Sequence, residues 1–242
     1  MVDFLRISTR SKKKGQIEIY PKFICRRSKD LMIRGSDFYA IWLEDRGLWS
    51  TDEQDVTDTV DKELDNYYNE NKDRFGQDIQ VKVLHMWDNE SGVIDAWHKY
   101  CQKQMRDSFN MLDEKLIFSN TECSKKDYAS KKLEYPLEPG KCEAYDKLMS
   151  VLYTEEERRK LEWAIGAIVT GDSTKIQKFM VLYGAFGTGK STVLNIIQML
   201  FNGYYSVFDA KALGSSSIHC RCCCGHRRFY SESVCLERRC DR

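Results

Sequence analysis

Residues 178–201 read KFMVLYGAFGTGKSTVLNIIQMLF, and this stretch decides how the chain is interpreted. The residues of Lys178–Tyr183 that follow its lysine form a continuous apolar run. This pattern predicts that Lys178–Tyr183 is a strand buried on both faces. Gly184–Ser191 follows at once and fits the motif G-x-x-x-x-G-K-[ST]. Apolar residues then recur at helical spacing up to Phe201, and Asn202-Gly203 predicts the end of a helix. A strand, a glycine-rich loop and a helix in this order form the context that a phosphate-binding loop requires.

Each residue type in this loop has a physical role in holding phosphate. Glycines let successive backbone amides point inward toward phosphate oxygens, and the N-terminus of the following helix adds partial positive charge. Lys190, the predicted catalytic residue, is expected to reach the β- and γ-phosphates, and the Ser191 hydroxyl is expected to ligate Mg²⁺. The predicted cofactors are therefore ATP and Mg²⁺. The predicted nucleotide-binding residues are Gly184, Ala185, Phe186, Gly187, Thr188, Gly189, Lys190, Ser191 and Thr192, the last with its side chain on the helix surface.

Hydrolysis needs more groups than this loop supplies. A second strand should end in acidic residues that hold Mg²⁺ and orient water, and ring ATPases add a polar sensor and an arginine from a neighbouring subunit. After the loop helix, the only strand-like run is Tyr204–Phe208, which ends at Asp209. Asp209 is a candidate for the metal-holding acid, and its alternative role is a turn or a helix cap. The sequence therefore predicts nucleotide binding without efficient turnover.

Composition is that of a globular protein with no membrane-spanning segment. The chain has 242 residues, of which 42% are hydrophobic and 31% charged, with a net charge of +1. Its apolar runs are much shorter than the roughly 20 residues of a membrane helix, and residues 1–10 lack the apolar stretch of a secretory signal. A cytoplasm, that of the host if the chain is encoded by a phage, is the expected location. Basic clusters at Arg10–Lys14 and around Arg26 favour solvated strand ends over nucleic-acid contacts.

The first half of the chain predicts a mixed α and β domain. Ile17 and Ile19 alternate with polar residues, and Asp37–Leu43 precedes a turn at Glu44–Gly47, after which Leu48 and Trp49 predict the second strand of a hairpin. Apolar residues at helical spacing then predict two helices, and an alternating pattern predicts a short strand between them. The helical positions are Val56, Val60, Leu64 and Tyr67 or Tyr68, then Val93, Trp97, Tyr100, Cys101 and Met105; the strand positions are Ile79, Val81 and Val83.

Two tryptophans and a polar segment complete the interpretation of this half. Trp87 and Trp97 are expected to lie in the core rather than to serve as stacking platforms for bases. Lys125–Gly140 contains Pro136, Pro139 and Gly140 and is the best candidate for a linker.

Helices are expected between the linker and the loop. Apolar residues from Tyr145 to Leu152 predict a short helix. Thr154 and Glu157 form a predicted capping box, in which each side chain satisfies the other residue's backbone amide. The helix that begins there should end at Gly171.

Residues 157–217 resemble the start of the motor domain in phage and plasmid primase–helicases. This family belongs to the superfamily 3 helicases and is related to the poxvirus primase–helicase. Residues 37–64, DFYAIWLEDRGLWSTDEQDVTDTVDKEL, are similar to the small domain upstream of that motor. The resemblance implies an AAA+-like P-loop NTPase that assembles as a homo-hexamer on single-stranded or forked DNA, with no membrane association. The family's acidic second motif, sensor and arginine finger have no counterpart here.

The last residues change in character. Six of the ten cysteines lie between Cys220 and Cys240, and no lysine follows Lys211. His219, the cysteines and His226 are residue types that bind zinc. Several of these cysteines are contiguous, however, which is not the usual spacing of ligands in a structural zinc site. Disulfides conflict with a cytoplasmic location. A shifted reading frame and metal binding both remain open, and the first predicts a disordered tail.

The resulting interpretation is an α/β protein with three parts. Residues 1–140 form a smaller α+β or helical upstream domain, 141–217 contain a helical lead-in and the start of a P-loop NTPase domain, and 218–242 form an aberrant tail. The leading hypothesis is the ATP-binding part of a phage replicative DNA helicase, truncated and deficient in hydrolysis. Its alternatives are a small P-loop kinase or phosphotransferase and a non-catalytic module that binds a replication partner.

Overall fold

The chain has a mixed α/β fold and divides into two compact units. The computed structural model describes residues 2–13, 15–35, 37–76, 79–88, 92–104 and 110–207. Unit 1 comprises residues 1–112 and 122–130, and unit 2 comprises residues 113–121 and 131–242. No helix in the described ranges is long and apolar enough to cross a bilayer.

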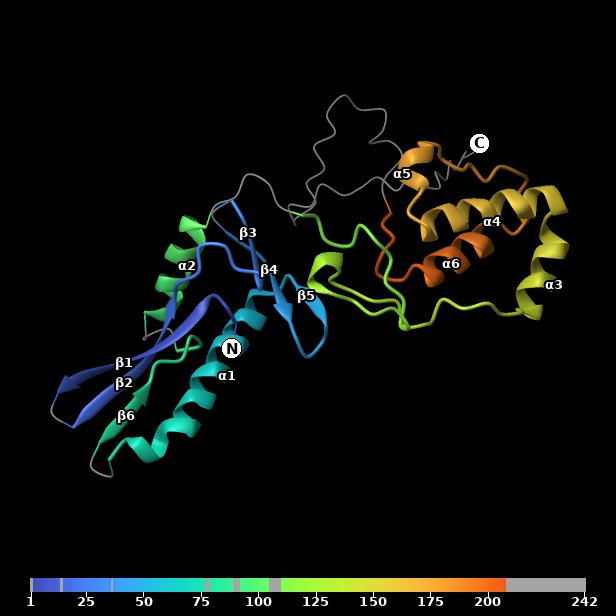
Figure 1. The fold of residues 1–242 in the computed structure, drawn as a ribbon. Coiled ribbons are helices and arrows are strands. Elements are labelled where there is room, and N and C mark those ends of the chain that lie inside the picture. The colour runs from blue at the N-terminus through green and yellow to red at the C-terminus, as the bar shows by residue number, and fades with distance from the viewer. Residues whose placement is uncertain are drawn as a thin grey trace. The chain divides into compact units, whose positions relative to one another are not determined.

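The first sheet of unit 1, sheet A, pairs an N-terminal hairpin with a strand from later in the chain. Its strands are β1 (Leu5–Lys13), β2 (Gln16–Phe23) and β6 (Gln80–Val83), in the order β1-β2-β6 (Figure 1). β1 and β2 are antiparallel, and Gly15 has φ +82° in the turn between them, a conformation that glycine adopts without strain. β6 runs parallel to β2, which places Gln80 opposite Gln16. The predicted strands around Ile17 and Val81 are thus confirmed.

The second sheet of unit 1 is antiparallel and contains the predicted hairpin. Its strands are β3 (Leu31–Arg34), β4 (Asp37–Leu43) and β5 (Leu48–Ser50), in the order β3-β4-β5. The Gly47 amide donates to the Leu43 carbonyl at 2.9 Å and closes the turn. Trp42 lies opposite Trp49, and their rings meet edge to face with centroids 5.8 Å apart.

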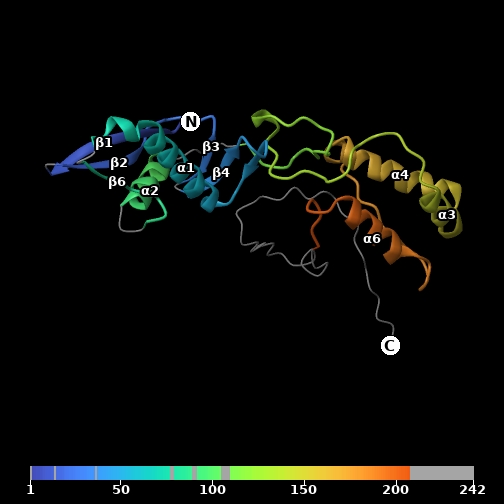
Figure 2. The same cartoon turned by 90° about the horizontal axis from the view of Figure 1, so that it is seen from below.

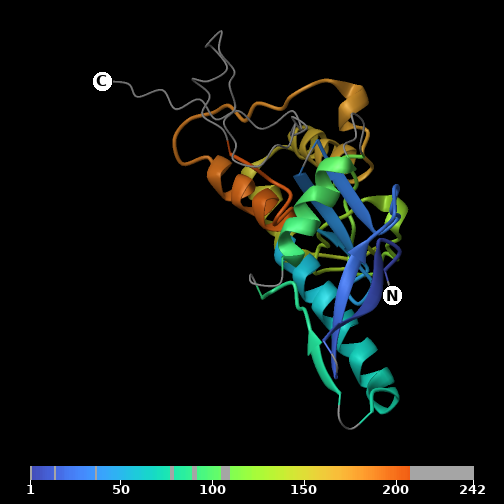
Figure 3. The ribbon, with the colours of Figure 1, turned by 90° about the vertical axis from the view of Figure 1, so that its left-hand side faces the viewer.

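Two helices complete the core of unit 1. α1 (Glu53–Asn71) begins at Asp52, whose side chain accepts a hydrogen bond from the Gln54 amide, and runs alongside sheet A before the short 3-10 helix η1 (Lys72–Arg74) (Figure 3). α2 (Val93–Lys103) packs against β2 and β4. Tyr67 and Tyr68, at the end of the predicted face of α1, are only partly buried. The other described residues of the two predicted faces are buried, and these are Val56, Val60, Leu64, Val93, Trp97, Tyr100 and Cys101. Met105 lies outside the described residues.

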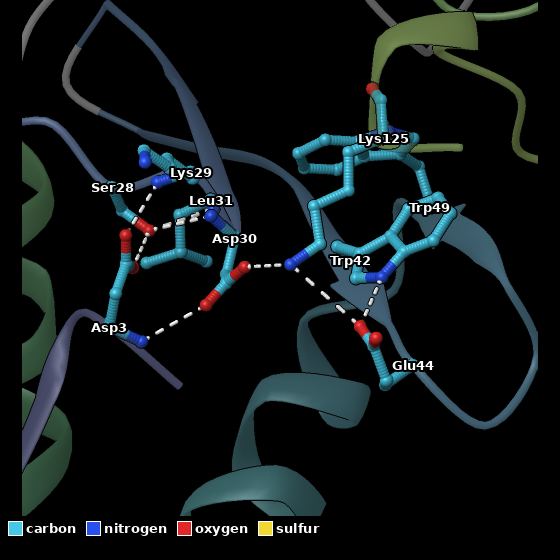
Figure 4. Close-up of polar contacts among 9 residues, drawn as sticks. All are labelled: Asp3, Ser28, Lys29, Asp30, Leu31, Trp42, Glu44, Trp49 and Lys125. Carbon is cyan, nitrogen blue, oxygen red and sulfur yellow. Dashed lines mark hydrogen bonds and ion pairs between the residues drawn. The ribbon is translucent and has the colours of Figure 1, made fainter. Parts of the chain in front are cut away.

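A group of polar contacts holds residues 122–130 to the rest of unit 1. In the 3-10 helix η3 (Lys125–Asp127), the Lys125 ammonium lies 2.6 Å from Oδ1 of the buried Asp30, and this bond raises the lysine's pKa (Figure 4). The other Asp30 oxygen accepts the Asp3 amide at 3.0 Å, and Trp49 Nε1 donates to the Lys125 carbonyl at 3.0 Å. Part of the segment expected to be a linker is therefore packed, and the boundary between units falls inside it.

Unit 2 is helical in its described part (Figure 2). Its helices are α3 (Glu143–Leu152), α4 (Glu155–Val169), α5 (Ser173–Ile176) and α6 (Lys190–Leu200). Met149, Leu161 and Val193 form its buried core, one residue from each of the three longer helices. The predicted capping box is confirmed, because Thr154 accepts the Glu157 amide and Glu157 accepts the Thr154 amide.

The strand predicted at Lys178–Tyr183 is wrong, and so is its burial on both faces. The structure has neither helix nor strand there. Met180 and Leu182 pack against the core of unit 2, whereas Phe179, Val181 and Tyr183 are 66%, 54% and 98% exposed. A strand needs a neighbour to receive its backbone hydrogen bonds, and every strand in the described residues lies between Leu5 and Val83, in unit 1.

The remaining predictions for unit 2 fall at the end of the chain. Residues 204–207 do not form a strand. Phe208, Asp209 and the cysteine-rich tail lie outside the described residues, so the predictions for the metal-holding acid, for zinc and for a disordered tail stay predictions. The assignment of domains 1–140, 141–217 and 218–242 also stays a prediction.

Candidate nucleotide-binding loop

The loop Gly184–Gly189 leads directly into α6. Gly189 is the N-cap residue of this helix and has φ +76°. The first intrahelical hydrogen bond runs from the Val193 amide to the Gly189 carbonyl at 3.1 Å. Because the first turn of a helix has no intrahelical acceptors for its amides, the amides of residues 190–192 can bind an anion at the end of the helix where the dipole is positive.

The Lys190 side chain folds back over the loop. Its ammonium donates to the Gly184 carbonyl at 3.0 Å, to the Ala185 carbonyl at 2.6 Å and to Thr188 Oγ1 at 3.0 Å. A lysine ammonium has three N–H donors, so these three oxygens use all of them. The positive charge is thus held at the loop without a carboxylate partner among these contacts, and it can exchange its oxygen acceptors for those of a phosphate.

Thr188 connects the two ends of the loop. Its hydroxyl donates to the Ala185 carbonyl at 2.9 Å and accepts from the Lys190 ammonium. A side chain that both closes the loop and orients the lysine reduces the conformational freedom that would be lost when a ligand binds.

Gly189 has a positive φ, and a side chain at this position would also meet the end of the half-buried Leu152 side chain. A Cβ atom built on Gly189 would lie 2.6 Å from Cδ2 and 2.8 Å from Cδ1 of Leu152, the last residue of α3. The positive φ independently disfavours any residue with a side chain. The helix that begins at the loop therefore packs closely against the end of α3.

We predict that Gly189→Ala displaces the loop or α3 and lowers the affinity for MgATP at least about tenfold, since a small misplacement of binding groups has a large effect. The strain at positive φ, with a smaller contribution from displacing the Leu152 side chain, is expected to cost about 1–3 kcal/mol of stability. Thermal melts and calorimetric titration of this variant measure the two effects. Gly171→Ala is the matched control, because φ is +75° there and no atom lies within 4 Å of the added Cβ. A loss of stability as large in the control would show that strain at positive φ, not the contact with Leu152, is responsible.

The predicted site residues are brought together only in part. Gly184, Ala185, Thr188 and Lys190 are in mutual contact, and Ser191 is exposed in the first turn of α6, where its hydroxyl can reach a cation beside a bound phosphate. Phe186 is fully exposed at the tip of the loop. Leu152 is the contact that sequence reasoning missed, because it comes from a separate helix and no local pattern links it to the loop.

The described ranges contain no cluster of three or more histidine, cysteine, aspartate or glutamate residues that could hold a metal ion. Unit 1 has a cavity of about 320 Å³ lined by Asp37, Phe38, Glu53, His98, Cys101 and Gln102. Burial and the nearby Glu53 and Asp37 raise the pKa of the Cys101 thiol to about 12. This thiol therefore stays protonated at neutral pH and is no nucleophile.

Comparison of the chain with protein-family models, with curated proteins and with solved structures gave no match.

Proposed function

We propose that Gly184–Ser191 binds the phosphate groups of ATP together with Mg²⁺. The observation that carries the proposal is the Lys190 ammonium held over a loop whose curled backbone ends at the N-terminus of α6. A cation and backbone amides converge there, and a hydroxyl lies beside them. This is the donor set that a chain of phosphates requires.

In this proposal each group keeps the role that the motif gives it. Lys190 exchanges its three loop oxygens for oxygens of the β- and γ-phosphates, and amides of the loop and of the first turn of α6 bind the remaining phosphate oxygens. Ser191 ligates Mg²⁺, which would neutralise part of the phosphate charge when bound. Gly187, with φ +82°, and Gly189 let the backbone follow the phosphates.

The wider proposal is that the chain is the ATP-binding part of a phage replicative DNA helicase of the superfamily 3 type, acting in the host cytoplasm. Its support is the resemblance of residues 157–217 and the glycine loop itself. The proposal includes an AAA+-like P-loop NTPase domain and binding without efficient hydrolysis. The homo-hexamer and the DNA substrate belong to the same proposal.

Calorimetric titration of the full chain tests the phosphate site. MgATP and inorganic tripolyphosphate are expected to bind and to compete with each other, and adenosine is expected to bind much more weakly. Binding of adenosine as tight as that of ATP would contradict a phosphate-directed site. No binding of either phosphate compound would contradict the proposal as a whole.

Single-turnover measurements with labelled ATP separate the alternatives. Little hydrolysis, with or without single-stranded DNA, is expected of the chain. Transfer of the γ-phosphate to a small acceptor would favour a kinase instead. Robust hydrolysis that is lost in Lys190→Ala would overturn the expectation of deficient turnover while supporting the nucleotide site.

A further inference from the structure

Sheet A has one face packed on the core and one face rich in positive charge. Residues directly opposite each other on paired strands share a face. Arg6 lies opposite Lys22, Arg10 opposite Glu18, and Glu18 opposite Lys82. These residues therefore lie on the same side of all three strands.

The other side of the sheet belongs to the core. Ile19 is fully buried in the cluster that α1 and α2 complete, and Ile7, Val81 and Val83 pack against the same cluster. Since residues alternate between the faces along a strand, the helices cover the side opposite to the charged residues. The charged side carries the exposed Arg6, Arg10, Lys12, Lys22 and Lys82, which we call the basic face.

One feature of the basic face opposes stability, and a second concentrates its positive charge. Arg6 and Lys22 form a directly opposed pair of like charges, an arrangement that destabilises a sheet. The Arg10 guanidinium and the Lys22 ammonium both lie over the Tyr20 ring, at 5.0 and 5.4 Å from its centroid. The half-buried Tyr20 ring, which also packs against the core cluster, thus holds two cations close together on this face.

The face contains one acidic residue, and it is already engaged. Glu18 is 7% exposed and lies 2.7 Å from Arg10 Nε and 3.5 Å from Lys12 Nζ. Its hydrogen bond with Arg10, with help from Lys12, lowers the pKa of Glu18. Arg10 and Lys12 remain half exposed, at 47% and 52%, so they can contact another anion. Counting Glu18, the face keeps a clear excess of positive charge.

We infer that the basic face binds the sugar–phosphate backbone of a single-stranded nucleic acid. Strands lie about 4.8 Å apart, so the cations are spread over a shallow surface about two strand spacings wide rather than projecting as a narrow ribbon. A ribbon of two strands suits the major groove of a duplex. A positively charged surface that follows the backbone is the way in which proteins bind a single strand without reading its sequence. The inference rests on the proposed helicase function only in taking the partner to be a nucleic acid. It does not involve the glycine loop.

Binding of a fluorescein-labelled oligothymidylate of about 16 nucleotides to the full chain tests this inference. Without nucleotide, Arg6→Gln/Lys22→Gln is expected to weaken binding at least about tenfold at about 50 mM salt. Because each phosphate contact contributes about 0.7 to the slope of log K against log salt for single strands, the slope should fall by about 1.4. The thermal stability of this variant should stay close to that of the wild type, because relief of the opposed like charges offsets the loss of the contact between Lys22 and the Tyr20 ring.

Lys99→Gln/Lys103→Gln removes the same charge from exposed positions on α2 and serves as the matched control. It is expected to retain wild-type affinity within about twofold, because exposed charges away from the contact are largely screened by salt. Equal weakening by both double variants would overturn the inference, as would tighter binding to a duplex of equal length. Binding to phosphatidylserine vesicles but not to the oligonucleotide would also overturn it. Lys190→Ala should bind the oligonucleotide normally, so failure here and failure of the nucleotide site are distinguishable.

Glu18→Gln is expected to tighten oligonucleotide binding severalfold and to make its salt slope steeper by about 0.7 for each cation released. The substitution removes the negative charge and frees Arg10 and Lys12 for phosphate. Anisotropy titrations at several salt concentrations measure the effect. Unchanged affinity in a folded variant would show that Arg10 and Lys12 do not contact the strand.

The dependence of folding stability on pH provides a separate check on the ion pairs of Glu18 with Arg10 and Lys12. Because the folded pKa of Glu18 is lowered, its pairing stabilises the fold at neutral pH, and this contribution is lost as the pH falls through the lowered pKa. Glu18→Gln should therefore remove part of the acid sensitivity of unit 1.

Discussion

Lys190→Ala is expected to weaken the binding of MgATP about a hundredfold or more. Charge-assisted hydrogen bonds are worth about 1.5–3 kcal/mol each, and every 1.4 kcal/mol changes a dissociation constant about tenfold. The loss is smaller than the sum of the phosphate contacts, because wild-type Lys190 must first give up its bonds to Gly184, Ala185 and Thr188. Calorimetric titration with MgATP and with tripolyphosphate measures the change.

Lys175→Ala is the control for this prediction. Lys175 belongs to the same unit, is 80% exposed and pairs with Asp172 at 2.9 Å. An exposed pair of this kind contributes little to stability, and the variant should retain wild-type affinity for both compounds. If Lys190→Ala bound tripolyphosphate as tightly as the wild type does, the loop could not be the phosphate site. A melt of each variant excludes unfolding as the cause.

Helices with a strong local pattern could be predicted from the sequence. The apolar face of α1 repeats at Val56, Val60 and Leu64, and all three are fully buried. The capping box at Thr154 and Glu157 is also present as predicted. In both cases the interacting residues lie within a few positions of each other, so a short stretch of sequence contains most of the information.

Whether a strand forms depends on a partner strand that the local sequence pattern does not identify. The short strand around Val81 forms because Gln80–Val83 pairs with β2, which lies far upstream in the sequence. No local signal indicates that pairing. Lys178–Tyr183 has an equally strong apolar pattern and forms no strand, since no described strand of unit 2 can receive its hydrogen bonds. An apolar run thus predicts the capacity to form a strand, and tertiary pairing decides whether one exists.

The candidate site shows the same division. The motif identified the loop, its lysine and its glycines because the required residues are adjacent in sequence. The close contact between Gly189 and Leu152 could not be predicted, because it depends on how α3 packs against α6. The basic face could be seen only in part, as the cluster Arg10–Lys14, for which the sequence favoured solvated strand ends over nucleic-acid contacts. Arg6, Lys22 and Lys82 are distant in sequence and meet only through the register of sheet A.

Of the two tryptophans expected in the core, one is buried and the other is exposed. Trp97 lies on the apolar stripe of α2 and is fully buried, whereas Trp87 is 71% exposed, so the prediction for Trp87 is wrong. Trp87 follows β6 in an irregular segment with no helical or alternating pattern. Aromatic character alone did not predict burial, and periodic position did. This difference provides a matched pair for measuring what holds unit 1 together.

Trp97→Ala is expected to destabilise unit 1 by about 3–5 kcal/mol, the range for removing a large buried aromatic side chain. The Trp97 ring contacts Phe4, Phe23, Phe38 and Tyr100, with centroids 5.3 to 6.2 Å away. Its Nε1 donates to Glu53 Oε1 at 2.7 Å, which ties α2 to the start of α1. The substitution removes both the packing and this bond and leaves a cavity that the surrounding rings fill only in part.

Urea unfolding followed by circular dichroism measures the effect, with Trp87→Ala as the control. The control removes an equally large side chain from an exposed position and should change stability by no more than about 0.5 kcal/mol. A fall of equal size in both variants would mean that the cluster around Trp97 does not organise unit 1. Because the basic face is built on the sheet that this cluster supports, Trp97→Ala should also weaken oligonucleotide binding once unit 1 unfolds. Trp87→Ala should leave that binding unchanged, because Trp87 is not among the residues of the basic face.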